Sequence, residues 1–498
     1  MQNLLIRLEK IQESLLHADT QHASFLETLH PYWRTSAANL IHYLKLRSFD
    51  LREIQDKLSE MSISSLAHCE GYTYRNLENV IHLLHKFFGS KPHITQNPED
   101  YPSYRESKFL LKDHTQNLFG TRWVNDTRYT MVTLPTEAGK DAALVRSLIE
   151  SGMNIARINT GHDNPDIWLR MVENIKTSAQ GLDRSCKIYF DLHGPKIRVS
   201  ALRTESGRKA QFVQIKKDDL ICLHSKKLKK KHLPKKCKGI MMEWPEILEV
   251  LQPYNEIWFD DGKIGGLVRE VHDDYIIAKV THTSKKGKKL KLEKGINFPD
   301  TRLKIPALTM EDRSHLPFIV KHADMVGYSF VKTPDDIQLL HEALRELGRS
   351  DLGIILKIET ASAFDNLPKL LLTSMRNPIV GVMVARGDLA VEVGFERISE
   401  VQEELLWICE AAHVPVIWAT QVLENLAKTG TATRAEITDA AMSVRAECVM
   451  LNKGPHILDA LKTLRNIMAR MDDHFEKKKG MLRALGIAKN YFQHPGLN

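Results

Sequence analysis

Long hydrophobic runs and paired cysteine motifs are both missing from this sequence, and aromatic residues make up only 7% of its 498 residues. No segment approaches the roughly 20 consecutive apolar residues that cross a bilayer, so we expect no membrane-spanning helix. The first 16 residues are interrupted by Arg7, Glu9, Lys10 and Glu13, which argues against a signal or transit peptide. These absences predict a cytoplasmic protein.

The cysteines are scattered and include no Cys-x-x-Cys pair. The six are Cys69, Cys186, Cys222, Cys237, Cys409 and Cys448. Such scatter is typical of a reducing compartment and argues against structural zinc and disulfides, so we expect six free thiols.

Positive charge is in excess, with a formal net charge of +8. It is concentrated in two lysine-rich segments, 226–238 and 285–294. Charge alone admits phosphorylated small molecules or nucleic acid as partners. Residues 50–81 could imitate a helix-turn-helix, but the second helix carries Glu70 and Glu78 beside Arg75, a poor fit to a phosphate backbone. We therefore expect small-molecule substrates, no nucleic acid and no membrane.

The chain divides into five segments by pattern. A hydrophobic share of 43% with 27% charged residues suits a globular protein, and 498 residues exceed what one core uses. We expect a helical N-terminal domain and linker at 1–120, the two parts of the main domain at 121–200 and 294–480, an inserted domain at 201–293 and a tail at 481–498.

Helical periodicity marks the N-terminal region. Two apolar helix faces are expected, one with Leu4, Leu8, Ile11 and Leu15, and one with Leu51, Ile54, Leu58 and Met61 after an N-cap at Asp50. Gly89 predicts the end of a further helix, and the Pro- and Asn-containing segment 90–103 reads as a linker.

Short apolar runs then recur about every thirty residues, most of them followed by a helical pattern, as in repeated βα units. The expected strands are Tyr129–Leu134, Asn154–Thr160, Lys187–Leu192, Ala323–Val331, Gly353–Glu359, Ile379–Ala385, Val414–Thr420 and Glu447–Leu451. Eight such strands close a parallel barrel. The spacing breaks after the third strand, where β-rich, lysine-rich sequence is inserted. We therefore expect an α/β fold: a (β/α)8 TIM barrel with a β-rich lid domain over its mouth and an N-terminal helical extension.

Reactive side chains in such a barrel lie where the strands end, on the C-terminal face. Lys357 and Glu359 end the fifth strand two residues apart, so both side chains point to the same side. Asp388 follows the sixth strand. Two carboxylates beside an ammonium can hold Mg²⁺ and leave positive charge for an anionic substrate, although a structural ion pair is an equal alternative for these residues alone.

Further polar residues follow the other strands. Arg157 and Asn159 alternate on the second strand, and the third offers Asp191, Lys196 and Arg198. Paired guanidinium donors suit a phosphate, although an isolated arginine here is more often a surface residue. The Thr420 hydroxyl can donate to a carboxylate or relay a proton.

Eight motifs run in a fixed order from about residue 127 to 452. They are SGMNIARIN, FDLHGPKIR, FDDG, GINFP, LKIET, MVARGDLAVEV, WATQVLENL and TRAE. In this set and order the sequence resembles the pyruvate kinase family. The fold of that family is a (β/α)8 barrel with a mobile β-rich domain inserted after the third strand, where the spacing breaks here.

The resemblance implies transfer of a phosphoryl group from phosphoenolpyruvate to ADP, giving pyruvate and ATP, with Mg²⁺ or Mn²⁺. By motif position, Lys357 stabilises the phosphoryl group in flight, Glu359 and Asp388 hold the metal, and Arg157 binds phosphate. Thr420 and the backbone at Gly387 and Asp388 hold the substrate carboxylate, and Thr420 lies near the carbon that is protonated. The resemblance assigns the nucleotide side to Arg198, Lys294, Asn159 and His162, and places Asp260 and Asp261 on the lid.

Departures from the family pattern concern the potassium site. Asn159 and Asp191 remain, but Gly161 stands where the family has Ser. Lys196 replaces a common Glu, a change that marks potassium-independent members. The resemblance thus implies that the Lys196 ammonium stands in for the monovalent cation and that K⁺ is not required.

Other departures are expected to reshape the nucleotide side or slow turnover. The loop after Thr133 is shortened in TLPTEAG, MLNKGPH stands where the family has Ser-Gly-Glu-Thr, and Ala390 replaces a glycine. The resemblance finds no counterpart of the family's C-terminal regulatory domain, so we expect no activation by that route. The sequence leaves the oligomeric state open, and a homo-oligomer is compatible with it.

Two other functions fit the same barrel residues. A metal-dependent aldolase acting on pyruvate enolate also uses a Glu and an Asp at neighbouring strand ends with an Arg, but needs neither Lys357 nor a lid. The second alternative is a non-catalytic pseudoenzyme that binds a phosphometabolite, against which the intact Lys357, Glu359, Asp388 and Thr420 argue.

Overall fold

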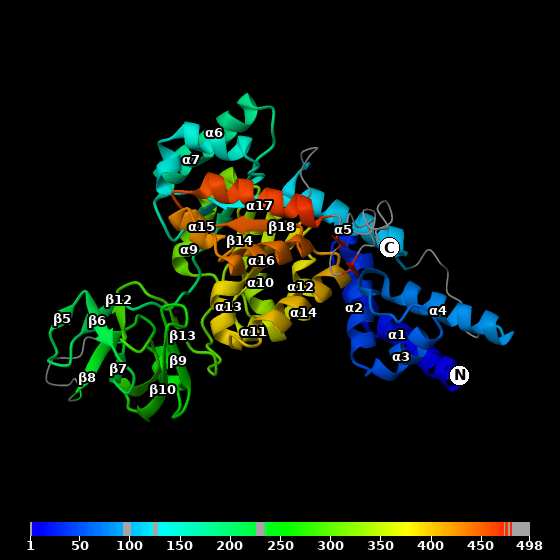
Figure 1. Ribbon diagram of the computed structural model, residues 1–498, viewed down its shortest axis with the longest axis horizontal. Coiled ribbons are helices and arrows are strands. Elements are labelled where there is room, and N and C mark those ends of the chain that lie inside the picture. The colour runs from blue at the N-terminus through cyan, green and yellow to red at the C-terminus, as the bar shows by residue number, and fades with distance from the viewer. Residues whose placement is uncertain are drawn as a thin grey trace, which may run out of the picture.

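The computed structural model describes residues 2–92, 101–122, 128–225, 234, 236–472, 474–476 and 479–480. Most of the lysine-rich segment 226–238, part of the linker 90–103 and the whole tail 481–498 lie outside the described residues. Figure 1 shows three parts: N-terminal helices, a central barrel and a β-rich insertion on the opposite side of the barrel.

Eight parallel strands close the barrel in the order β1-β18-β17-β16-β15-β14-β3-β2. The strands are β1 (Tyr129–Thr133), β2 (Ile155–Asn159), β3 (Lys187–Asp191), β14 (Met325–Tyr328), β15 (Gly353–Ile358), β16 (Val380–Ala385), β17 (Val416–Ala419) and β18 (Cys448–Leu451). All eight were expected from the sequence, and each is shorter than expected. The barrel itself is therefore confirmed.

Helices surround these strands and pack apolar faces on them. They are α6 (Ala142–Glu150), α7 (Pro165–Gly181), α9 (Met310–His322), α10 (Pro334–Glu346), α11 (Ala361–Asp365), α12 (Leu367–Ser374), α13 (Arg386–Val393), α14 (Ile398–Ala411), α15 (Glu424–Thr429), α16 (Arg434–Met442) and α17 (Ile457–Met471). Several begin with a side-chain cap; Thr309, Thr333 and Thr433 each form a capping box with the acidic residue three positions later. These caps fix where each loop on the C-terminal face ends.

Helix α5 (Tyr104–Phe119) closes the N-terminal end of the barrel. Leu118 and Phe119 are 2% and 1% exposed and lie in one cluster with the inward side chains of the strands, including Ile355, Met383 and Ile417. Gly381 makes room for this plug, because a Cβ there would lie 2.5 Å from Leu118 Cδ2. No local sequence pattern predicts this contact.

The other N-terminal helices are α1 (Gln2–Glu27), α2 (Arg34–Arg47), α3 (Arg52–Glu60) and α4 (Thr73–Phe88). The expected face of α1 is buried, and α4 ends at Gly89 in the left-handed conformation, as expected. The expected N-cap at Asp50 is wrong by one residue, because Leu51 occupies that position. The Asp50 carboxylate instead accepts from the Arg52 backbone N–H and side chain.

The N-terminal helices are fastened to the barrel by buried polar contacts. The Trp33 indole donates to the carbonyls of Asn377 and Pro378, at 3.0 and 3.1 Å. Asn39 Nδ2 donates at 2.8 Å to the carbonyl of Ala411, the last residue of α14. Because each contact satisfies a backbone carbonyl that would otherwise be buried unpaired, the interface is specific as well as apolar.

The insertion holds short strands and one helix: β4 (Ala201–Arg203), β5 (Lys209–Ala210), β6 (Phe212–Ile215), β7 (Leu220–His224), β8 (Cys237–Met241), α8 (Glu246–Val250), β9 (Glu256–Phe259), β10 (Ile264–Val271), β11 (Tyr275–His282), β12 (Lys288–Lys291) and β13 (Ile296–Asn297). Eight of the strands form one sheet and β6 pairs with β12. The insertion touches the C-terminal rim through α13, where Asn297 Nδ2 donates to Glu392 at 3.1 Å. Its action as a lid stays a prediction.

The last helix is shorter than its sequence pattern. The sequence of residues 456–479 predicts one amphipathic helix, but α17 ends at Met471, and two short antiparallel strands follow, β19 (Phe475–Glu476) and β20 (Lys479–Gly480). All six cysteines are free, as expected. None of the described helices is both long and apolar enough to cross a membrane.

Candidate active site

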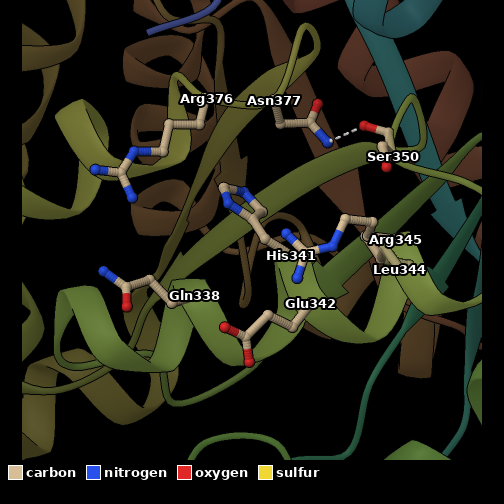
Figure 2. A pocket seen from close by; sticks show the side chains of 8 residues that line it. All are labelled: Gln338, His341, Glu342, Leu344, Arg345, Ser350, Arg376 and Asn377. Carbon is tan, nitrogen blue, oxygen red and sulfur yellow. Dashed lines mark hydrogen bonds between the residues drawn. The ribbon is translucent and has the colours of Figure 1, made fainter. Parts of the chain in front are cut away.

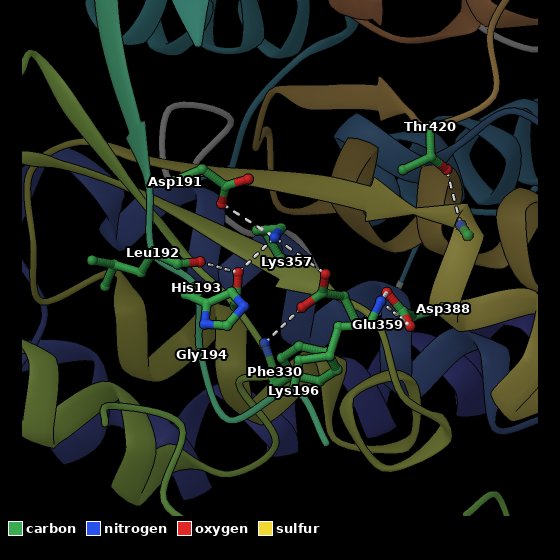
Figure 3. Close-up of polar contacts among 12 residues, drawn as sticks. Asp191, Leu192, His193, Gly194, Lys196, Phe330, Lys357, Glu359, Asp388 and Thr420 are labelled. Atoms are coloured by element: carbon green, nitrogen blue, oxygen red, sulfur yellow. Dashed lines mark hydrogen bonds and ion pairs between the residues drawn. The ribbon is translucent and has the colours of Figure 1, made fainter. Parts of the chain in front are cut away.

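Lys357 and Glu359 point together into the C-terminal end of the barrel (Figure 3). Lys357 ends β15 at 8% exposure, and its Nζ lies 3.2 Å from Glu359 Oε1. The same ammonium donates to Ser329 Oγ at 2.5 Å and lies 3.1 Å from Asp191 Oδ1. Burial by itself lowers the pKa of Lys357, but Asp191 and Glu359 outweigh it and raise the pKa, so the group is cationic.

Asp191 joins the cations of two strands. It is 1% exposed, and its Oδ2 accepts from Arg157 Nε at 2.8 Å, while its Oδ1 faces Lys357 and the Tyr189 hydroxyl. The parallel register places Arg157 beside Tyr189 and Asn159 beside Asp191. Burial raises the pKa of Asp191, but Lys357 and Arg157 together hold it below its usual range. The carboxylate therefore fixes both cations in place.

Glu359 and Asp388 form the most acidic part of the site. Glu359 is 4% exposed, and its Oε2 accepts from the Phe330 backbone N–H at 2.7 Å. Burial raises the pKa of Glu359 even beside Lys357, and the charges of Asp388 and Asp191 add to the rise. A cation between Glu359 and Asp388 would remove this repulsion, and hard carboxylate oxygens suit Mg²⁺. The described residues hold no group of three metal-binding side chains, so water or substrate would complete the shell.

Lys196 lies on Asp388. Its Nζ is 2.9 Å from both carboxylate oxygens, and the two side chains are 20% and 15% exposed. The preceding turn is anchored because the buried Asp312 accepts from the backbone N–H groups of His193 and Gly194. The Lys196 charge thus reaches the site through Asp388 rather than through Asn159 or Asp191.

The turn after β17 is held in an unusual conformation. Thr420 and Gln421 have φ angles of 63° and 59°, which side chains rarely adopt, and Thr420 Oγ1 accepts from the Gly387 N–H at 2.9 Å. Arg386 donates to the Ala419 carbonyl at 2.9 Å and to the Thr420 carbonyl, and forms an ion pair with Asp439. Arg386 therefore fixes Thr420 against the N-terminus of α13.

Of the residues expected on the nucleotide side, Asn159 ends β2 and His162 follows it, and Arg198 and Lys294 lie near the insertion. Burial lowers the pKa of His162, and the charges of Lys453, Arg198 and Arg157 lower it further. Asn159 Oδ1 accepts from the Gly161 N–H at 3.0 Å, within its own turn.

Lys294 opens the second barrel segment, 294–480, and contacts the insertion. Its Nζ lies 2.7 Å from Asp260 Oδ1, and it is 41% exposed. Arg198 reaches from the barrel toward this segment and donates to the Glu293 carbonyl at 2.8 Å. No described contact joins Lys294 to the Lys357 cluster.

The structure brings together Lys357, Glu359, Asp388, Arg157 and Lys196, and places Thr420 and Gly387 beside them. The sequence patterns offer Asp191 as a polar residue of the third strand, and the resemblance makes it a potassium ligand. They do not single out Ser329, Lys453 or the anchoring role of Arg386. Asp191 had one available signal, its place two residues after Tyr189 on an inward-facing strand position.

Residues 128–455 match the model of the family described as pyruvate kinase, barrel domain. The chain belongs to the pyruvate kinase family. It is 30% identical over 353 residues to a pyruvate kinase of Bacillus licheniformis, and 29% identical over 349 residues to one of Staphylococcus aureus strain USA300. Each match covers 69% of this chain and 57% or 56% of the relative. The chain thus spans less than three fifths of these pyruvate kinases.

Proposed function

We propose that this protein transfers a phosphoryl group from phosphoenolpyruvate to ADP, giving pyruvate and ATP, in a Mg²⁺-dependent and K⁺-independent reaction. The observation that carries the proposal is the Lys357 ammonium, buried between Asp191 and Glu359, with the charge of Asp388 at the start of α13 acting on Glu359. Membership of the pyruvate kinase family supports the same reaction class. We also propose that the five segments 1–120, 121–200, 201–293, 294–480 and 481–498 act as the units named above.

Lys357 supplies the central charge. In a loose transition state for phosphoryl transfer, negative charge is spread over the equatorial oxygens of the migrating group. A cation that Asp191 and Glu359 already hold in position meets that charge without reorganising. Arg157, fixed by Asp191 and Thr133, presents its remaining N–H groups to the phosphate.

Thr420 and the start of α13 are proposed to hold the substrate carboxylate. The N–H groups at Gly387 and Asp388 lie in the first turn of an eight-residue helix, where backbone donors and the helix dipole favour an anion; the Gly387 N–H would release Thr420 to donate to it. Thr420 Oγ1, which accepts from Gly387 in this structure, can turn its hydroxyl toward the enolate carbon and pass it a proton.

Glu359 and Asp388 would hold Mg²⁺, which would supply neutralising charge for the phosphate oxygens. Asp388 has both oxygens on Lys196 in this structure, so one of them must exchange Lys196 for the metal. Mn²⁺ has the same ligand preferences and is expected to substitute. Arg198, Lys294, Asn159 and His162 are proposed to bind ADP and ATP.

Independence of K⁺ is supported by how the expected cation ligands are used. Asp191 accepts from Arg157 and Lys357, and Asn159 accepts from Gly161. A Cβ at Gly161 would lie 2.7 Å from His193 Cδ2, so the serine of the family pattern would require the His193 side chain to move. Lys196 adds the positive charge that a monovalent cation would bring.

A second candidate is a phosphometabolite-binding protein without catalysis. It is favoured by one observation, the ion pair of Lys196 with both oxygens of Asp388, which closes the metal position. The aldolase alternative is disfavoured by the family assignment.

The test is a coupled assay of ATP formation with phosphoenolpyruvate, ADP and Mg²⁺ on the full chain, alongside calorimetric binding of phosphoenolpyruvate. Turnover that disappears in Lys357→Met supports the kinase. Binding without turnover in the wild type supports the pseudoenzyme, and pyruvate consumption that depends on an added aldehyde supports the aldolase.

A further inference from the structure

A pocket of about 280 Å³ lies at the end of the barrel opposite Lys357. One wall is a face of α10, with Gln338, His341, Glu342 and Arg345 at helical spacing. The other wall is the turn before β16, with Arg376 and Asn377, as Figure 2 shows. Because this turn precedes β16 and α10 precedes β15, the pocket belongs to the N-terminal face and is separate from the proposed active site.

The lining of the pocket carries more positive than negative charge, two guanidinium groups against one carboxylate. In the described part of the chain, neither Arg345 nor Arg376 has an ion-pair partner within 4.0 Å. Both charges act on His341, whose pKa is lowered to about 4, mainly by burial and further by Arg376 and Arg345. The imidazole is therefore neutral near pH 7, and its buried Nε2 has no hydrogen-bond partner among the described residues. Glu342 is the acidic residue of the lining.

The unpaired nitrogen of His341 is unfavourable without a ligand, because a buried ring nitrogen that lacks a partner costs free energy. The exposed guanidinium groups of Arg345 and Arg376 are solvated by water and are available to an anion. An anion bound to the arginines would gain charge-assisted hydrogen bonds, and its oxygen or hydroxyl could pair with His341. Arginine is well suited to this role because its planar N–H groups match carboxylate and phosphate oxygens.

We propose that this pocket binds a small organic anion, with its phosphate or carboxylate between Arg345 and Arg376 and with a hydroxyl or amino group donating to Glu342. Gln338 can donate to or accept from the same ligand. The volume suits a molecule of a few carbon atoms. The Glu342 carboxylate favours a ligand with hydrogen-bond donors over an anion that carries acceptors alone.

The same turn is a structural junction. Asn377 Nδ2 donates to the carbonyls of Ser350 and Leu352, which lead into β15, and its Oδ1 accepts from the Ile379 N–H just before β16. The carbonyl of Asn377 also accepts from Trp33 of the N-terminal helices. A ligand that bridges α10 and Arg376 therefore ties together the starts of the two strands that carry Lys357 and precede Asp388.

The test is calorimetry on the full chain with three probes: inorganic phosphate, glycerol 3-phosphate and L-serine, with glycerol as an uncharged reference. We expect glycerol 3-phosphate or serine to bind and to raise the melting temperature, and glycerol to have no effect. The double variant Arg345→Gln/Arg376→Gln should lose at least tenfold in affinity. Arg146→Gln, an exposed arginine on α6, is the matched control and should bind as the wild type does.

Two further variants separate this pocket from the proposed active site and test the ligand class. Lys357→Met should bind the preferred probe as the wild type does, whether or not the proposed reaction is correct. Glu342→Gln should lower the preference for that probe over inorganic phosphate. The proposal is overturned if no probe binds, or if binding survives the double arginine variant and is lost in Lys357→Met.

Discussion

The Lys357 cluster at the C-terminal end of the barrel and the α10 pocket at the N-terminal end use positive charge in opposite ways. In the cluster Lys357, Arg157 and Lys196 each lie against a carboxylate. In the pocket Arg345 and Arg376 have no such partner among the described residues. The buried cations need their acids, because an isolated buried charge is costly, whereas exposed guanidinium groups are solvated by water. Acids therefore hold the cations in place in the site where we propose chemistry, and water is left to solvate those of the pocket.

Replacing Lys357 should produce the largest effect. Lys357→Met removes the charge that meets the migrating phosphoryl group, and we expect kcat to fall by about a hundredfold or more. The measurement is the coupled assay at saturating substrates. Lys369→Met, an exposed lysine on α12, is the control and should retain full activity. Equal activities of the two variants would contradict the role of Lys357.

Asp191→Asn tests whether the stability of the Lys357 cluster depends on the Asp191 carboxylate. Two buried cations lose their shared partner, so we expect the free energy of unfolding in urea to fall by about 3 kcal/mol. The double variant Arg345→Gln/Arg376→Gln should stay within about 0.5 kcal/mol of the wild type, because its groups are exposed. Comparable losses of unfolding free energy in both variants would contradict the difference between the Lys357 cluster and the α10 pocket.

The loss of stability in Asp191→Asn should depend on pH. The folded pKa of Asp191 lies below its unfolded value of about 3.9, so its ionised form stabilises the fold above that pH. The stability difference between wild type and Asp191→Asn should be constant above about pH 5 and shrink as pH falls through the folded pKa. A difference that instead grew toward acid would contradict the assigned direction.

Arg386→Lys should have an intermediate effect. Lysine cannot donate to two carbonyls and a carboxylate in one plane, so the left-handed Thr420 turn should relax. We expect kcat to fall about tenfold and KM for phosphoenolpyruvate to rise, because the Thr420 hydroxyl would no longer be held in position. Arg434→Lys, on the exposed side of α16, serves as the matched control.

Omitting K⁺ should have the smallest effect. With tetramethylammonium as the only monovalent cation, we expect activity to stay within about twofold, because Lys196 already supplies positive charge near Asp388. A requirement for added K⁺ would mean that Asn159 and Asp191 release their present partners to bind it.

Local patterns were sufficient for the barrel and for part of the site. Alternation placed Lys357 and Glu359 on one side of a strand, and one βα repeat placed Asp388 beside them. The pairing of Asp191 with Arg157 and Lys357 depends on the register between strands and on long side-chain reach, which no local pattern encodes. Likewise α17 is shorter than the helix predicted over 456–479, because two short antiparallel strands form from Phe475 that the helical pattern does not reveal.

The plug formed by Leu118 and Phe119 has a consequence for the order of synthesis. Residues 104–119 leave the ribosome before any barrel strand. The helix that closes the N-terminal end of the barrel is therefore synthesised before the strands that it packs against. A shortened chain that begins at β1 would have an unfilled apolar cavity at the N-terminal end of the barrel. Gly353 and Gly381 leave space there for the Leu118 side chain, which this chain would lack. Anyone seeking the barrel alone should keep α5 with it.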